Sequence, residues 1–329
     1  MSAMIVFPGA YAIYEVTLTN AREHREGTPM DFTGKTALIT GGVSGIGFGI
    51  ARAFARAGIE LVLTYRNAEY QAQAAAWFRE QRLPGPRFVR LDVTDRAAWA
   101  ALARELAPLH VLVNNAGVSV FGPTDEASFA DYDWIMGVNF GGVVNGLVSC
   151  IPLLKAHGEG GHIVNVASMA AFLAGPQAGI YTASKFAVRG LTECLRFNLA
   201  PYRIGVSLMC PGLTRTHAWD SALKRPAAFA ASGFAPPDRA ELERFGLAFE
   251  EGMDPLVVGE KTLAGMRENR ALILTHPEHG PDFDQIHAAC RAALPDEPVP
   301  EGRAHIERLR REAAKAAAAG ERIGLDDLT

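Results

Sequence analysis

The sequence predicts an α/β fold: a single doubly wound domain with a seven-stranded parallel sheet and helices on both faces. Two observations predict it. Short apolar, β-branched runs recur along the chain, and Ala-rich segments with helical spacing separate them. Strands that are apolar along their whole length are typical of a parallel sheet buried on both faces, and strand–helix alternation is typical of right-handed βαβ units.

The elements follow one another in order. We expect strands at residues 36–40, 61–64, 88–91, 111–113, 162–166, 206–209 and 272–274. Helices are expected at 48–57, 69–81, 97–106 and 129–155, and one more from Tyr181 to about residue 200. Seven strands in one alternation indicate a single domain, which we assign to residues 30–280.

Three segments depart from this pattern. Residues 1–29 lack the basic start and cleavage site of a signal peptide, and Met30 directly precedes the periodic region, so we interpret 1–29 as a leader that is not native or is disordered. Residues 217–252 form a long Pro-, Ala- and Phe-rich insertion after the sixth strand, as expected for a lid. Residues 281–329 are predicted to be a helical extension with a thin apolar stripe.

Composition excludes several classes of protein. The 329 residues are 49% hydrophobic with a formal charge of −4, so we expect a large core and no binding of nucleic acid or of an anionic membrane. No apolar run reaches about 18 residues, so no membrane span is expected. Four scattered cysteines without a CxxC pair indicate a cytoplasmic protein. No metal site is predicted, because the histidines around residues 276–287 are interpreted as a solvated surface segment.

A glycine-rich turn joins the first strand to the first helix. Gly41, Gly45 and Gly47 permit positive φ and a close approach of the backbone to a diphosphate, while the helix start presents free N–H groups. The turn also contains Ser44 and Ile46. Its spacing is GxxxGxG, which alone could be a tight turn, but its place between a strand and a helix predicts dinucleotide binding.

The tip of the second strand indicates which dinucleotide. In many dinucleotide folds an acidic residue there binds the ribose 2′-hydroxyl, but this tip reads Tyr65-Arg66 with no carboxylate. Tyr65 can pack on adenine, and Arg66 can pair with a 2′-phosphate. The alternative is a solvated charge at a strand end. We therefore predict a preference for NADP(H), with NAD(H) as the second option.

Two further strand ends complete the expected cofactor site. Asp92 and Val93 end the third strand, where the carboxylate can accept a hydrogen bond from the adenine amino group. Asn115, Ala116 and Gly117 end the fourth strand, where small residues leave room for the cofactor.

Four residues predict the chemistry. Tyr181 and Lys185 are i and i+4 on one helix, so both project from one face. A phenol has a pKa of about 10, and a lysine ammonium beside an oxidised nicotinamide would lower the pKa of Tyr181 enough for acid–base catalysis. Ser168, at a strand end, can donate to a substrate oxygen. Asn139 lies in mid-helix near glycines, and because both residue types disfavour a helix interior, a local interaction must compensate. Each residue alone has an ordinary structural explanation; their joint occurrence favours a redox site.

These motifs resemble those of the short-chain dehydrogenase/reductase family. TGGVSGIG, LDV, NNAG, Asn139, Ser168, YTASK and PGLTRT occur in the family's order between residue 35 and about residue 216. The resemblance implies a Rossmann-type domain in which Tyr181 is the general acid/base. It implies that Lys185 contacts the nicotinamide ribose, that Ser168 is the oxyanion partner, and that Asn139 holds a water relaying protons from Lys185.

The resemblance also implies cofactor contacts and an assembly. The nicotinamide carboxamide is expected to meet Pro211, Gly212, Leu213, Thr214 and Thr216. A homodimer or homotetramer is expected through the helices that carry Asn139 and Tyr181. The chain departs from the family's NAD-preferring pattern at the second strand and is longer beyond residue 217. There it resembles a bacterial subgroup sharing the FGP, DYDWIMGVN and NRALILTHPE stretches, some of whose members oxidise benzylic alcohols of lignin-derived aromatics.

The expected substrate is an apolar ketone or secondary alcohol, with an aromatic group as one option. The predicted wall comprises Val118, Val120, Phe121, Met169, Phe172 and Leu173, with Trp219, Phe229 and Phe234 from the lid. The alternative is that the lid aromatics only pack the lid down. Because Arg215 and Lys224 are cationic, an anionic substrate is a further alternative. Two other functions compete: an NAD-dependent alcohol dehydrogenase of aromatic catabolism, and a cofactor-binding sensor without turnover.

Overall fold

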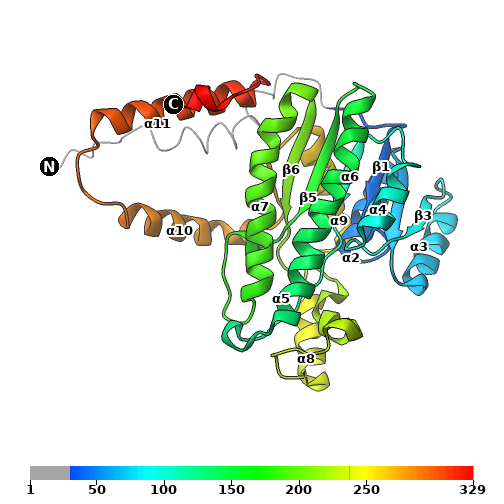
Figure 1. Ribbon diagram of the computed structural model, residues 1–329. Coiled ribbons are helices and arrows are strands. Elements are labelled where there is room, and N and C mark those ends of the chain that lie inside the picture. Colours follow the sequence, from blue (N-terminus) through cyan, green and yellow to red (C-terminus); the bar gives the residue numbers. More distant parts are fainter. Residues whose placement is uncertain (1–29, 237, 329) are drawn as a thin grey trace.

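The computed structural model describes residues 30–236 and 238–328 (Figure 1). Within them a seven-stranded, fully parallel sheet has the order β3-β2-β1-β4-β5-β6-β7. The strands are β1 (Thr36–Ile39), β2 (Glu60–Tyr65), β3 (Arg87–Arg90), β4 (Val111–Asn114), β5 (Gly161–Val166), β6 (Ile204–Cys210) and β7 (Leu272–Leu274). The predicted doubly wound fold is confirmed. The expected leader, 1–29, lies outside the described residues, so that interpretation stays a prediction.

The strand order creates the place for a ligand. The chain moves outward from β1 through β2 to β3, then returns to the other side of β1 with β4 and continues outward to β7. The crossovers after β1 and β4 therefore leave in opposite directions. In such sheets the ligand cleft opens at the carboxyl ends of the strands where this reversal occurs, between β1 and β4.

Helices cover both faces of the sheet, and each face has its own core. One core contains Leu38, Leu112 and Ile163 from the strands, and it is covered by α4 (Arg96–Ala103), α5 (Phe129–Met136), α6 (Gly142–Ala156) and α7 (Gly179–Leu199). The other contains Ile39 and Val113, and it is covered by α2 (Gly45–Arg56), α3 (Ala68–Glu80) and α9 (Pro255–Arg267). Neighbouring strand residues thus point into opposite cores, which explains the continuous apolar runs.

The predicted helix 129–155 is one rod with a change of winding inside it. Between α5 and α6, residues Gly137–Gly141 form a π-helical turn. By length and composition the rod, Phe129–Ala156, is apolar enough to cross a membrane, although no membrane span was expected from the sequence. Its packing explains the composition, because Val143, Leu147, Cys150 and Leu154 lie in the core beneath it.

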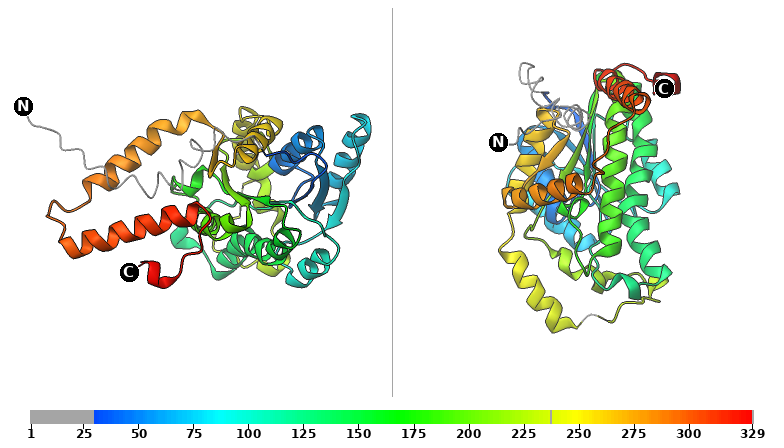
Figure 2. Two further views of the ribbon diagram at one scale, coloured as in Figure 1. Left: turned by 90° about the horizontal axis from the view of Figure 1, so that it is seen from above. Right: turned by 90° about the vertical axis from the view of Figure 1, so that its left-hand side faces the viewer.

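The lid and the extension lie at different edges of the domain. Residues 217–252 contain short 3-10 segments, His217–Lys224 and Ala227–Phe229, and helix α8 (Arg239–Glu250). After β7, α10 (Gly280–Ala292) projects away from the sheet and α11 (Glu301–Ala318) runs back to α7, as the left view in Figure 2 shows. Ala313 and Ala317 of α11 are buried where that helix meets α7. The division into leader, domain and extension stays a prediction.

Two glycines let α2 and α9 cross in direct contact. A Cβ on Gly49 would collide with the carbonyl of Pro255, and a Cβ on Gly259 would collide with the carbonyl of Gly49. Both obstacles are backbone atoms that no rotamer change can move. The crossing therefore fixes α9, whose first residue Pro255 lines the cleft described below.

We expect Gly259→Ala to destabilise the protein by about 1–3 kcal/mol, because the helices must separate to admit the methyl group. Gly302→Ala is the matched control: this exposed glycine of α11 has no atom near its missing Cβ, so alanine should leave stability unchanged or raise it by up to about 1 kcal/mol. Chemical denaturation of both variants measures the difference. Equal stabilities would contradict the contact.

Candidate active site

A cleft of about 1170 Å³ opens at the carboxyl edge of the sheet. It extends from the ends of β2 and β3, past the β1–β4 reversal, to the start of α7 and the lid. Most of the predicted site residues line it: Gly41, Ser44, Gly45, Ile46, Tyr65, Arg66, Asp92, Val93, Asn115, Ala116, Gly117, Ser168, Tyr181, Lys185, Pro211, Gly212, Leu213, Thr214 and Thr216. Gly47 and Asn139 do not, and both have structural positions instead.

The glycine turn has the geometry that a diphosphate site needs. Gly41 and Gly45 have φ values of 62° and 51°, in the region that favours glycine. Ser44 precedes α2 without a side-chain capping bond, so the first N–H groups of the helix are not used by a cap. Gly47 is needed for packing, because a Cβ there would collide with the Gly41 carbonyl and the Asn115 amide.

A cross-link holds this turn against the one after β4. The Thr40 hydroxyl accepts from the backbone N–H groups of Asn115 (2.8 Å) and Ala116 (3.0 Å). The Asn115 side chain donates to the Thr40 carbonyl at 2.9 Å. The two turns therefore form one rigid wall, consistent with the expected role of the NNAG segment.

At the far end of the cleft, Arg66 and Asp92 face each other. The Arg66 guanidinium lies 3.5 Å from one Asp92 oxygen, and both side chains are nearly half exposed. The other oxygen accepts from the N–H (2.9 Å) and hydroxyl (2.7 Å) of Thr94. Burial alone would raise the pKa of Asp92, but the Thr94 hydrogen bonds and Arg66 hold it below its ordinary value. One oxygen of Asp92 is thus committed to Thr94, and the other is shared with Arg66.

Tyr181 and Lys185 enter the cleft from the first turns of α7. The Lys185 ammonium donates to the Val166 carbonyl at 3.3 Å and lies 5.5 Å from the centre of the Tyr181 ring. Burial lowers the pKa of Lys185 to about 8, with the Cys210 thiol opposing the shift. Lysine and phenol are therefore neighbours, as the i, i+4 spacing predicts.

The pKa of Tyr181 differs from the expectation. Burial raises it above its ordinary value, and the hydrogen bond with Ser168 only partly opposes this shift. The expected lowering therefore depends on the positive charge of a bound oxidised nicotinamide and is not built into the protein alone.

Ser168 is positioned by the turn that follows β5. It precedes a 3-10 turn, Met169–Ala171, and its oxygen accepts from the Ala170 N–H at 3.1 Å. This contact uses a lone pair, so the hydroxyl proton is not needed by the turn and faces Tyr181. Ser168 can therefore donate to a substrate oxygen while its own position is fixed.

Asn139 sits in the π turn and is 1% exposed. Its side-chain oxygen accepts from the Val118 N–H (2.8 Å), and its amide donates to the Val118 carbonyl (3.0 Å) and the Ser184 hydroxyl (3.1 Å). Ser184 in turn donates to the Tyr181 carbonyl at 2.6 Å. These contacts supply the local compensation that the sequence required. Because they use both N–H groups of the amide, the side chain positions the site. The expected role of Asn139 in holding a water stays a prediction.

The substrate end is apolar, but fewer of the predicted residues line it. Val118, Phe121, Met169 and Leu173 do. Val120 is buried, Phe172 packs on Phe283, Trp219 packs against Gly246, and the rings of Phe229 and Phe234 pack on the core cluster around α5. The lid aromatic in the wall is Phe249, which continues a ring series from Phe121 through Phe245 at spacings of 5.3 and 5.4 Å.

His276 is a buried supporting residue, which corrects its interpretation as part of a solvated surface segment. It is 6% exposed. Its Nδ1 accepts from the Gly212 N–H at 2.9 Å, and its Nε2 donates to the Leu213 carbonyl at 2.8 Å. It therefore fixes the loop expected to meet the nicotinamide. A histidine directly after the last strand, whose end lies beside that of β6, was the signal available in the sequence.

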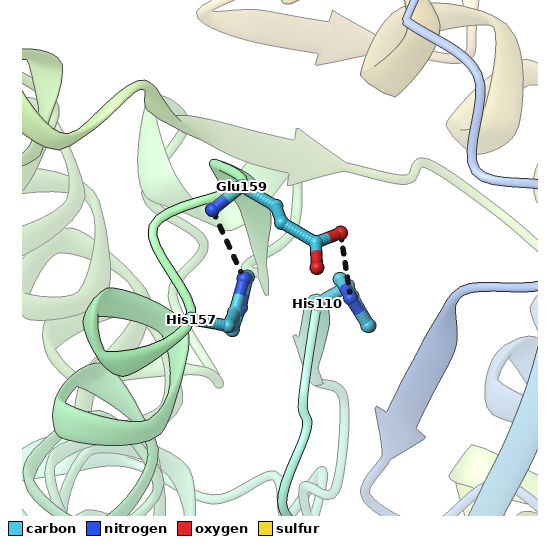
Figure 3. Close-up of side chains that lie close together, drawn as sticks. All are labelled: His110, His157 and Glu159. Atoms are coloured by element: carbon cyan, nitrogen blue, oxygen red, sulfur yellow. Dashed lines mark hydrogen bonds and ion pairs between the residues drawn. The ribbon is translucent and has the colours of Figure 1, made fainter.

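One group of candidate metal ligands occurs outside the cleft in the described part of the chain: His110, His157 and Glu159 (Figure 3). His157 accepts from the Glu159 N–H and donates to the Leu109 carbonyl, so both ring nitrogens are used. His110 accepts from the Thr36 N–H, and Glu159 pairs with Lys35. The Lys35 ammonium at this group would repel a metal ion, and the ring nitrogens of His157 already have hydrogen-bond partners. The group therefore has a structural role at the amino edge of the sheet.

Comparison with known proteins agrees with this geometry. The family model described as short chain dehydrogenase matches residues 35–226. A C alpha-dehydrogenase from Sphingobium sp. is 34% identical over 85% of this chain and 93% of its own length.

Two solved structures have the same fold. A short-chain dehydrogenase from Novosphingobium aromaticivorans superposes with a TM-score of 0.74 at 34% identity, covering 87% of this chain and 98% of the other. A short chain dehydrogenase/reductase from Burkholderia phymatum, solved in complex with NAD, gives 0.74 at 34% identity, covering 82% and 99%.

Proposed function

The chain belongs to the short-chain dehydrogenase family and is an oxidoreductase that acts on CH–OH groups; from that premise we propose that it interconverts a ketone and a secondary alcohol, using NADP(H), on an apolar substrate with an aromatic group. The observation that carries the proposal is the meeting of Tyr181, Ser168 and Lys185 in the cleft that also contains the diphosphate turn. The sensor interpretation is set aside, because the relatives are dehydrogenases.

Each residue has a defined task in this proposal. A bound nicotinamide dinucleotide supplies or accepts the hydride. Tyr181 transfers a proton to or from the substrate oxygen, and Ser168 donates a hydrogen bond to the same oxygen. Lys185, protonated at neutral pH with a pKa of about 8, stabilises the phenolate. Asn139 acts as a positioning residue, because its contacts fix Val118 on one side and Ser184 on the other.

The preference for NADP(H) is supported by charge. Among the described residues, the cleft is lined by the cations Arg52, Arg66, Lys185, Arg215 and Lys224 and by one carboxylate, Asp92. Arg66 stands at the tip of β2, where an acidic residue would repel a 2′-phosphate. Arg215 and Lys224 are in close pairs with Asp254 (2.7 Å) and Asp220 (2.6 Å), whereas the pair of Arg66 with Asp92 is longer (3.5 Å), so Arg66 is the principal candidate for phosphate binding.

One observation favours NAD(H) as the alternative cofactor. Because Arg66 already has a carboxylate partner in Asp92, part of its charge is neutralised before any phosphate binds. An NAD-dependent alcohol dehydrogenase of aromatic catabolism is thus the second candidate function.

The substrate class is supported by the wall. Val118, Met169 and Leu173 face the cleft beside Tyr181, and Phe121 and Phe249 close it. Arg215, beside the lid, and Lys224, within it, are both engaged by aspartates, so these two described residues offer no free clamp for an anionic substrate. The relative's name, C alpha-dehydrogenase, also supports oxidation of an alcohol carbon.

Four free cysteines support a cytoplasmic location.

We expect Tyr181→Phe to lose turnover by about 10²–10⁴-fold while binding the cofactor normally, because only the proton donor is removed. A screen of aromatic and aliphatic ketones and alcohols with each cofactor supplies the substrate for the assay. The control is Tyr132→Phe, an exposed tyrosine on α5, which should retain full activity. Retention of turnover by Tyr181→Phe would refute the assigned role.

We expect the wild-type protein to bind NADPH more tightly than NADH, and Arg66→Gln to weaken NADPH binding by about tenfold with little change for NADH. The physical reason is loss of the guanidinium that pairs with the 2′-phosphate. Arg79→Gln, an exposed arginine of α3 away from the cleft, is the control. Fluorescence titration measures all affinities, and tighter NADH binding by the wild type would favour the alternative.

We also propose that the protein assembles as a homodimer or homotetramer through α5, α6 and α7. Phe129, Val148 and Phe186 of these helices are 89%, 71% and 43% exposed, so each of the three helices presents a large apolar side chain to a second copy. Val148→Glu should shift sedimentation towards the monomer. Leu247→Glu, 68% exposed on α8, should not. A monomeric wild type would overturn this assembly.

A further inference from the structure

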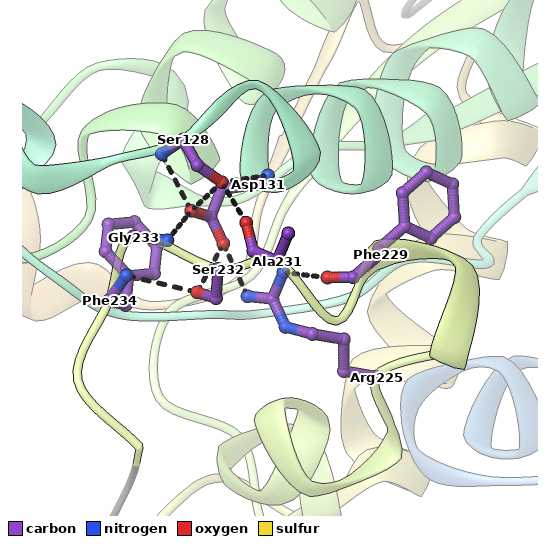
Figure 4. A network of polar contacts seen from close by, with 8 residues as sticks. All are labelled: Ser128, Asp131, Arg225, Phe229, Ala231, Ser232, Gly233 and Phe234. Carbon is purple, nitrogen blue, oxygen red and sulfur yellow. Dashed lines mark hydrogen bonds and ion pairs between the residues drawn. The ribbon is translucent and has the colours of Figure 1, made fainter.

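A fully buried carboxylate, Asp131, joins the lid to the body of the domain (Figure 4). One of its oxygens pairs with the Arg225 guanidinium at 2.7 Å and accepts from the Ser232 hydroxyl at 2.7 Å. The other accepts from the N–H groups of Ser128 and Gly233, both at 2.9 Å. Arg225, Ser232 and Gly233 all belong to the lid, whereas Asp131 and Ser128 belong to the start of α5.

The arginine is held as firmly as the carboxylate. Its side chain is 13% exposed, it donates to the Phe229 carbonyl at 3.2 Å, and it lies 4.7 Å from the centre of the Trp134 ring. Burial alone would raise the pKa of Asp131, but the N–H groups of Ser128 and Gly233 and the nearby hydroxyls hold it well below its ordinary range. Asp131 is therefore ionised at neutral pH and is a permanent partner for Arg225.

Beside this pair, the lid packs so closely on the domain that only glycine fits at two positions. A Cβ on Gly233 would collide with the Glu126 carbonyl, and a Cβ on Gly122 would collide with the ring of Phe234. The Ser128 hydroxyl also lies 2.7 Å from the Ala231 carbonyl. The middle of the lid thus packs directly on residues 122–131, independently of the ion pair.

The cleft-facing parts of the lid lie on both sides of this anchored stretch. Before it come Ala218, Ser221 and Lys224, which line the cleft. After it comes α8 with Phe249, which also lines the cleft and continues the ring series to Phe121. The position of the anchor consequently determines where both walls stand.

We propose that Asp131 and Arg225 form a latch that holds the lid over the substrate end of the cleft, and that these two positioning residues set which ketones and alcohols the enzyme accepts. The substrate part of this inference rests on the proposed function; the holding of the lid does not. Neither residue touches the cleft, so their effect on the reaction is exerted through the walls they support.

The test uses Asp131→Asn and Arg225→Met in the full-length protein. Asp131→Asn leaves the buried guanidinium without a counter-charge, and Arg225→Met keeps the volume but removes the pair. We expect deuterium exchange in peptides from residues 217–252 to accelerate by about tenfold, and KM for the best substrate to rise by about tenfold with kcat changed less than threefold. Cofactor affinity should stay within about threefold.

Controls separate the latch from general damage. Arg239→Gln breaks an exposed ion pair with Glu243 in the same lid and should change neither exchange nor KM. In the double variant Asp131→Asn/Arg225→Met, the changes in exchange and in KM should be smaller than the sum of the changes in the two single variants, because the two residues act as one unit. If Asp131→Asn does not fold, Arg225→Met decides, since it retains the hydrogen bonds of Asp131 to Ser128, Ser232 and Gly233.

The outcomes are distinct. Exchange and KM that match those of Arg239→Gln would overturn the latch. If the wild type turns over no ketone or alcohol, the proposed function fails, while the exchange measurement still decides whether the pair holds the lid.

Discussion

The side-chain amide of Asn139 connects the three parts of the molecule that the active site needs. It holds Val118, which follows β4, through two hydrogen bonds and reaches Ser184 of α7 with the third. Ser184 passes the constraint to the backbone of Tyr181. A buried amide with every group paired has one low-energy position, so the catalytic helix, the turn after β4 and the π turn cannot shift independently.

The π turn is what makes this connection geometrically available. An ordinary helix at residues 137–141 would leave its side chains in α-helical register, whereas the wider turn places Asn139 against Val118 and α7. The glycines around it offer no side chains that would resist the change of winding. The sequence predicted that something must compensate an asparagine in this position, but a single chain cannot show that the compensation is a π turn.

Local patterns predicted the fold because each strand and helix has its own signal. The apolar runs, the glycine turn and the i, i+4 pair gave the sheet, the cleft edge and the meeting of Tyr181 with Lys185. Long-range choices were beyond the sequence. Whether Phe249 or Trp219 lines the cleft depends on how α8 returns to Phe121, and burial of His276 depends on β7 lying beside β6. The direction of the Tyr181 pKa was missed because its desolvation depends on the whole surrounding cleft.

The cofactor half and the substrate half of the cleft are built on different principles. The first uses turns cross-linked by hydrogen bonds between side chains and main chain, as between Thr40 and Asn115, and tolerates little change. The second uses a segment whose buried ion pair lies outside the cleft, so the side chains of Ala218 and Ser221 that face the cleft take no part in that pair. For protein engineering this separation is useful. Libraries that randomise Ala218 and Ser221 alter the shape of the reaction chamber while the Asp131–Arg225 pair that holds the lid stays intact.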